Sequence, residues 1–68
     1  MSNEYKDWMY DKAQEFLFNE VCMVESIEYC TTYEDGYLMI CRHSDGSNGA
    51  YFVWLDDVGG WCVKFIVI

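Results

Sequence analysis

Residues 24–43 read VESIEYCTTYEDGYLMICRH, and this stretch decides the fold. It contains two runs rich in β-branched and aromatic residues, 24–33 and 37–43, on either side of the dipeptide Asp35-Gly36. Asp-Gly between two such runs is a strong signal for a two-residue β-hairpin loop, because both residue types tolerate the positive φ angles of a type I′ turn. The stretch therefore predicts two antiparallel strands joined by a tight turn.

The same loop sets an expected register for two cysteines. Counting back from Asp35-Gly36 along both strands places Cys30 opposite Cys41. A disulfide there needs an oxidising compartment, and we expect two thiols instead. The chain has four cysteines, no CxxC pair and a single histidine, so the pattern does not match a zinc site. We expect neither a metal nor another cofactor.

Strand signals continue on the C-terminal side of the hairpin. Residues 50–56 and 61–68 are again dominated by β-branched and aromatic side chains. The segment SDGSNG at 44–49 and the pair Gly59-Gly60 supply turn chemistry before each of these runs. Two further strands are therefore expected.

On the N-terminal side the apolar residues follow a helical period from Tyr5 to about Val21. Their shared face contains Tyr5, Trp8, Met9, Ala13, Phe16 and Leu17. A chain of 68 residues holds one core, so we expect one domain, residues 1–68. The predicted fold class is α+β, with an N-terminal amphipathic helix packed on a four-stranded antiparallel sheet in the order α-β-β-β-β.

The charge balance is strongly acidic, with twelve acidic residues, four basic ones and a net charge of -8 at pH 7. Such a field repels nucleic acid and attracts basic surfaces. We therefore expect a basic protein as partner and no direct binding of nucleic acid. The first residues contain no basic n-region, and no apolar run approaches the roughly 20 residues that span a bilayer. No membrane contact and a cytoplasmic location are expected.

Part of the negative charge forms a row on the predicted helix. At 100° per residue, acidic positions spaced by three, four and four residues fall on one stripe away from the apolar face, and an aromatic residue continues it. The stripe consists of Glu4, Asp7, Asp11, Glu15 and Phe18. Further carboxylates stand at the predicted turns, namely Glu34, Asp35, Asp56 and Asp57. A solvated helix face and ordinary turn chemistry explain these residues without a partner. The functional interpretation makes all nine a partner-binding surface.

In size, acidity, aromatic content and the carboxylate row Glu4, Asp7, Asp11 and Glu15, the chain resembles the small phage-encoded DNA-mimic inhibitors, including anti-restriction and anti-CRISPR proteins. The resemblance is compositional and covers no alignable motif, so it assigns no role to any numbered residue. It implies a viral inhibitor that acts in the cytoplasm of the host cell. Such an inhibitor docks on the basic nucleic-acid-binding surface of a nuclease or CRISPR effector and blocks its access to DNA.

A second hypothesis rests on the apolar character of both strand faces. One helix covers one face of a sheet, so the other face needs a strongly curled sheet, a second subunit or a binding partner. Candidate contacts of a homodimer are Phe52, Trp54, Ile66 and Ile68. The apolar run at 63–68 is expected either inside the sheet or in self-association, because an unpaired apolar edge strand invites aggregation.

A third and formal alternative is a small enzyme built on Cys41 and His43. His43 stands at a strand end beside a Gly-rich loop, where an ordinary surface histidine is expected. The sequence indicates no helix N-terminus or pocket that would activate the thiol. We therefore expect no catalytic activity.

Overall fold

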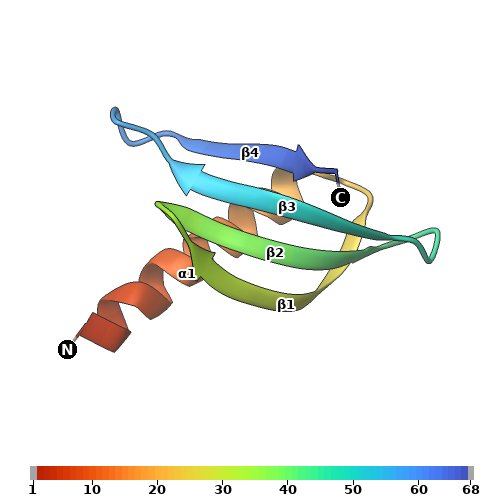
Figure 1. Cartoon of the computed structure of the whole chain (residues 1–68), viewed down its shortest axis with the longest axis horizontal. Helices are drawn as coiled ribbons and strands as arrows, with labels where there is room; N and C mark the ends of the chain where they lie inside the picture. The colour runs from red at the N-terminus through yellow and green to blue at the C-terminus, as the bar shows by residue number, and fades with distance from the viewer. Residues whose placement is uncertain (1, 68) are drawn as a thin grey trace.

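The computed structural model describes the backbone of residues 2–67 and the side chains of residues 9–67. It contains α1 (Ser2–Glu20), β1 (Val24–Tyr33), β2 (Gly36–His43), β3 (Asn48–Leu55) and β4 (Trp61–Ile66). The strands form one antiparallel sheet in the order β1-β2-β3-β4, and α1 lies on one face of it (Figure 1). The predicted α-β-β-β-β arrangement is confirmed.

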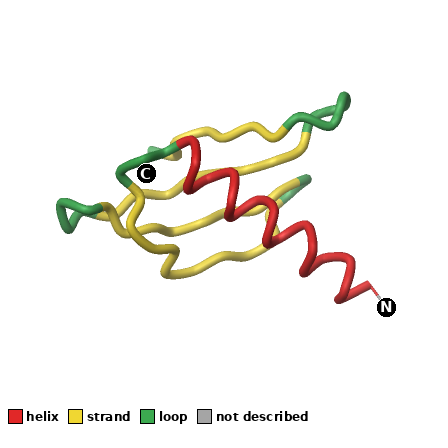
Figure 2. Tube along the Cα trace, turned by 180° about the vertical axis from the view of Figure 1, so that it is seen from behind, coloured by secondary structure: helices red, strands yellow, loops and turns green. Residues whose placement is uncertain are grey.

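A narrow apolar stripe holds α1 on the sheet. Figure 2 shows the helix running diagonally across the strands. Ala13 and Leu17 are fully buried against the sheet, since residues i and i+4 project from the same side of a helix. The sheet contributes Val24, Met39, Cys41, Tyr51 and Val53 to this core. Phe16 closes one side of it by stacking on Trp61, with ring centroids 6.4 Å apart. The helix thus shields the middle of one face of the sheet from water, while Phe65, next to Tyr51 on that face, stays 54% exposed.

The hairpin turn between β1 and β2 lies one residue earlier than the sequence predicts. Its loop is Glu34-Asp35, with Tyr33 paired to Gly36, and Glu34 adopts the positive φ of 53°. Gly36 belongs to β2 because β3 approaches it closely. A Cβ at Gly36 would lie 2.8 Å from the Cβ of Trp54, so this glycine serves backbone approach and not the turn.

Displacement of the loop shifts the pairing of β1 with β2. Cys30 lies opposite Met39, and Cys41 lies opposite Ile27. The predicted opposition of Cys30 and Cys41 is therefore wrong, because that register assumed glycine inside the loop. All four cysteines are free thiols.

The two edge strands differ in regularity. β1 pairs with β2 through register shifts between Val24 and Ser26 and between Ile27 and Tyr29, which are typical of β-bulges. β4 pairs with β3 without any shift along its whole length. The apolar C-terminal strand was expected either to lie inside the sheet or to take part in self-association. The structure places this strand, β4, at an edge of the sheet.

A buried histidine closes the end of the sheet where β2 meets β3. His43 is only 5% exposed, so the expectation of a surface histidine is wrong. Its Nδ1 lies 2.9 Å from Ser47 Oγ and its Nε2 lies 2.7 Å from the Tyr51 hydroxyl. Ser47 Oγ donates to Asp45 Oδ1 at 2.6 Å and therefore accepts the hydrogen bond from Nδ1–H, while Nε2 and the Tyr51 hydroxyl share the second hydrogen bond. The ring fits because residue 49 is a glycine without a side chain. A Cβ at Gly49 would lie only 2.7 Å from His43 Cε1.

Gly49→Ala is expected to lower the free energy of unfolding by about 1–3 kcal/mol, because the added methyl group displaces the His43 ring from a packed site. Urea denaturation followed by tryptophan fluorescence measures the change. In a His43→Ala background the same substitution should cost less than about 1 kcal/mol, since the ring is gone. Equal costs in the two backgrounds would contradict the contact.

Candidate functional site

Two turns at one end of the sheet carry exposed carboxylates. The turn between β1 and β2 holds Glu34 and Asp35, and the turn between β3 and β4 holds Asp57. Figure 1 shows both turns at the end of the sheet where α1 begins. All three side chains are exposed. We call this group, Glu34, Asp35 and Asp57, the acidic end.

Two hollows beside the acidic end meet at one tryptophan. The first, of about 340 Å³, lies between Met9 of α1 and the Glu34-Asp35 turn. The second, of about 320 Å³, is lined on α1 by Lys12, Glu15, Phe16 and Asn19 and on β4 by Trp61. Trp61, the first residue of β4, lines both hollows. An aromatic side chain therefore stands between carboxylates contributed by the helix and by the first turn.

The structure describes the side chains of only part of the predicted helical stripe. Asp11 and Glu15 are exposed, and they are one turn apart on the same side of α1. Phe18 is 41% exposed and continues this side. The side chains of Glu4 and Asp7 lie outside the described residues. The described half of the stripe faces solvent, and Glu15 connects it to the acidic end through the second hollow.

The carboxylate of Asp56, the remaining predicted contact residue, forms hydrogen bonds within its own turn. Its Oδ1 accepts hydrogen bonds from the backbone N–H groups of Val58 at 3.1 Å and Gly60 at 2.8 Å. Its own N–H donates to the Gly60 carbonyl at 2.8 Å. These bonds satisfy backbone groups in a turn that contains no proline. Asp56 therefore shapes the loop that presents Asp57.

Most carboxylates of the chain have no cation of their own. Twelve acidic residues face four basic ones, which leaves at least eight carboxylates uncompensated. Arg42 Nε lies 3.9 Å from Glu28 Oε2. This ion pair is near the last residue of β2, at the end of the sheet opposite the acidic end. The acidic end and the helical stripe thus present negative charge that attracts cationic groups.

Sequence reasoning missed Trp61 and Met9 as members of this site. The strand pattern treats Trp61 as one apolar residue among several, and the helical pattern places Met9 on the core face. Neither pattern predicts that α1 packs beside the start of β4. Only the packing of the helix across the sheet brings the two residues next to the acidic turn.

The Cys41 and His43 pair lies on the covered face of the sheet. Cys41 is fully buried, and burial, followed by the charge of Cys30, raises the pKa of the Cys41 thiol to about 11. Both ring nitrogens of His43 have hydrogen-bond partners. Neither a thiolate nor an open ring nitrogen is offered to a substrate here, because a nucleophilic cysteine needs a lowered pKa and access.

The opposite face of the sheet, which we call the open face, is apolar and carries an aromatic cluster. Tyr33 meets Phe52 edge to face with ring centroids 5.8 Å apart, and Phe52 stacks on Trp54 at 5.2 Å. Such pairs contribute about 0.5–1.5 kcal/mol beyond the area that they bury. Tyr33 is still 53% exposed, so the cluster remains in contact with water.

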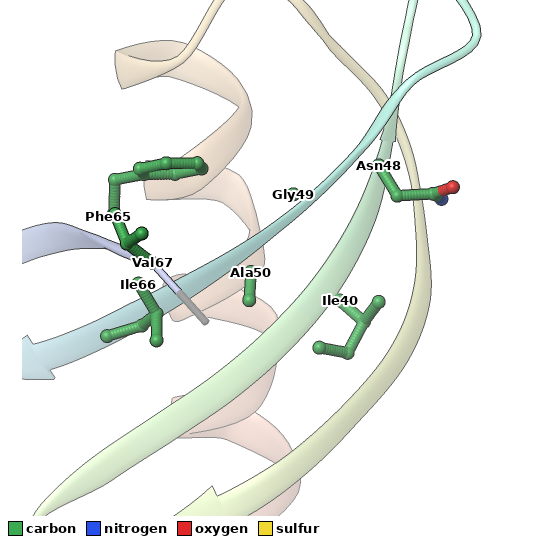
Figure 3. Close-up of a pocket in the computed structure, with 7 residues that line it drawn as sticks. All are labelled: Ile40, Asn48, Gly49, Ala50, Phe65, Ile66 and Val67. Carbon is green, nitrogen blue, oxygen red and sulfur yellow. The ribbon is translucent and has the colours of Figure 1, made fainter.

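A hollow lies next to this cluster on the open face. Ala50 of β3 stands between Ile40 of β2 and Ile66 of β4, and these three residues line a hollow of about 290 Å³ (Figure 3). Of the residues that the sequence proposes as dimer contacts, Phe52, Trp54 and Ile66 lie on this face. Ile68 lies outside the described residues.

Within the described residues, no helix is both long enough and apolar enough to cross a bilayer. The same part of the chain contains no group of three or more side chains suited to hold a metal ion. Comparison of the chain with protein-family models, with curated proteins and with solved structures finds no match. The acidic end and the open face are the two surfaces from which a function is proposed below.

Asp56→Ala is expected to lower the free energy of unfolding by about 1–2 kcal/mol, because two backbone N–H groups lose their acceptor. Asp57→Ala should change it by no more than about 0.5 kcal/mol, the usual range for an exposed surface residue. Urea denaturation of the two variants separates the structural carboxylate from the one presented to solvent. Equal losses in both variants would show that the bonds of Asp56 do not hold the turn.

Cys41 makes the stability of the protein sensitive to pH in the alkaline range. Its pKa rises from 9.0 for a free thiol to about 11 in the fold. Above about pH 9 the unfolded chain releases this proton while the folded chain keeps it, so stability falls as the pH rises towards about 11. Urea denaturation across this window should show a smaller fall in Cys41→Ala. Tyr10 and Tyr51 also have raised pKa values. Both tyrosines are present in the original protein and in Cys41→Ala, so the comparison isolates the thiol. Parallel pH profiles would contradict the assignment.

Proposed function

We propose that this chain is a non-catalytic inhibitor of the DNA-mimic type, which docks on the basic nucleic-acid-binding surface of a partner protein. The partner class is a nuclease or a CRISPR effector, whose access to DNA the bound chain blocks. The contact surface is the acidic end together with the outer stripe of α1, that is Glu4, Asp7, Asp11, Glu15, Phe18, Glu34, Asp35 and Asp57. The observation that carries the proposal is the gathering of exposed carboxylates from one helix and two separate turns.

The arrangement of charge supports this mode of binding. Asp11 and Glu15 are exposed neighbours on one helical row, where carboxylates stand about 5–6 Å apart. Like charges on such a row destabilise a helix slightly. A cationic groove built for phosphates relieves this repulsion on binding and accelerates the encounter, because complementary fields steer association.

Trp61 adds an apolar element to the acidic surface. It stands between the hollow that carries Glu34 and Asp35 and the hollow that carries Glu15. Tryptophan surrounded by polar groups is typical of the residues that dominate protein interfaces. An arginine of the partner that enters the first hollow would contact the indole together with a carboxylate of Glu34 or Asp35.

The catalytic alternative has less support. The sole histidine of the chain is buried and bonded through both nitrogens. The Cys41 thiol beside it on the same strand is buried and has a raised pKa. A binding role needs neither group, whereas a Cys–His mechanism needs both in contact with a substrate.

The proposal is tested by capturing the partner and then measuring its DNA binding. Tagged chain is used to isolate a partner from bacterial lysate at low salt, and the identified partner is purified. Its binding to a fluorescent DNA duplex is then titrated with the chain. We expect competition that weakens as salt rises, because screening reduces the attraction between exposed charges.

The matched variants are two double charge reversals of the same size. Glu15→Lys with Glu34→Lys alters the proposed surface and should weaken inhibition at least about tenfold. Glu20→Lys with Glu25→Lys alters two other exposed carboxylates and should leave inhibition within about threefold of the original. Equal effects would mean that net charge alone matters. No effect of the first pair would reduce the acidic end to a solvated surface.

A further inference from the structure

The open face combines a large, partly buried aromatic side chain, Trp54, with a hollow of its own. Along β3, Trp54 and Ala50 stand two residues on either side of Phe52. Leu38 of β2 is paired with Phe52, so these two residues mark the middle row of the face. The knob at Trp54 and the hollow at Ala50 are therefore equally distant from the same central row.

We propose that two copies of this chain pack face to face through the open face, related by a two-fold axis that lies between the sheets and runs perpendicular to the strands. With the axis over Phe52, the Trp54 ring of each copy covers the Ala50 hollow of the other. Phe52 and Leu38 meet their own equivalents. An isologous contact of this kind needs a self-complementary patch, which the placement of knob and hollow supplies.

The size of the open face suits a dimer. Four strands about 4.8 Å apart, with about six paired residues that each rise about 3.3 Å, give a flat footprint of roughly 400 Å². Side chains of facing sheets interdigitate, so the area that each copy loses exceeds this flat footprint, which is itself about half of the about 800 Å² per partner of a standard interface.

The distribution of charge selects the direction of the axis. An axis parallel to the strands would bring the acidic ends of the two copies together, with Glu34, Asp35 and Asp57 of both in one place. The perpendicular axis puts them at opposite ends of the dimer, each beside the end of the other copy that carries the Arg42–Glu28 pair and the Asp45 carboxylate. Like charges in proximity oppose association, so the perpendicular axis is favoured.

A second copy fits the open face better than a basic protein or a nucleic acid does. The charged side chains at this face among the described residues are Arg42, paired with Glu28, then Lys64, and at the margin Asp56, whose Oδ2 lies 3.9 Å from Cys62 Sγ. A basic partner gains no attraction there, and the net charge of -8 repels nucleic acid. The two Lys64 groups of a dimer fall at its rim, where water screens their repulsion.

Sedimentation of the full chain over a wide range of concentration tests the association. The original chain should sediment as a dimer at high concentration. Trp54→Glu should weaken association at least about tenfold, because it puts a charge into the apolar contact. The matched control is Val58→Glu, at a turn position that is 91% exposed, which should dimerise as the original does. Circular dichroism checks the fold of both variants.

Thiol crosslinking in a Cys22→Ser background tests the orientation and does not depend on the Trp54 variant folding. The perpendicular axis sets Cys62 near Ile66 of the other copy, so Ile66→Cys should yield a crosslinked dimer with a short bismaleimide. The parallel axis instead sets Cys62 near Tyr33 of the other copy. Crosslinking of Tyr33→Cys and not of Ile66→Cys would overturn the proposed arrangement.

A chain that stays monomeric at every concentration would overturn the proposal and leave the open face to a different protein. Dimerisation unchanged by Trp54→Glu would do the same for this surface. The inference is independent of the inhibitor function, because the acidic end and the helical stripe do not contribute to the contact. Charge reversal at Glu15 and Glu34 should leave sedimentation unchanged, while Trp54→Glu leaves the charged surface in place.

Discussion

A four-stranded sheet has two faces, and this chain has one helix to cover them. α1 buries Ala13 and Leu17 against one face and builds the core there. On the other face, Phe52 and Trp54 stack on each other and Tyr33 remains half exposed. A single core in a domain of this size contributes only about 3–5 kcal/mol of net stability. Burial of the second apolar face in a dimer adds area that the monomer lacks.

The same constraint separates the two working surfaces in space. The helix occupies one side of the sheet, so its exposed carboxylates Asp11 and Glu15 lie on the side opposite the open face. Two copies joined through their open faces would carry their acidic helices outward on opposite sides. Such a dimer would offer two equivalent acidic surfaces, and each would retain the hollows beside Trp61. Self-association and capture of a basic partner are thus compatible in one molecule.

Patterns of local origin allowed most of the fold to be predicted. Helical periodicity predicted α1, and runs of β-branched and aromatic residues separated by turn signals predicted the four strands in their correct order. The errors come from contacts between elements. Gly36 is needed for the approach of β3 and not for the turn, and His43 is buried because Gly49 leaves room for its ring. The carboxylates of the candidate site were visible in the sequence, whereas the place of Trp61 among them depends on the path of α1.

The contrast between the two edges of the sheet limits how the chain can polymerise. β4 offers a regular edge, whereas β1 is distorted by two register shifts, and bulged edges pair poorly with further strands. Two copies joined through their β4 edges would expose only β1 at both margins of the combined sheet. The two shifts lie in the first half of β1, so they oppose the addition of a further strand along that half of each margin and hinder growth into a fibre there.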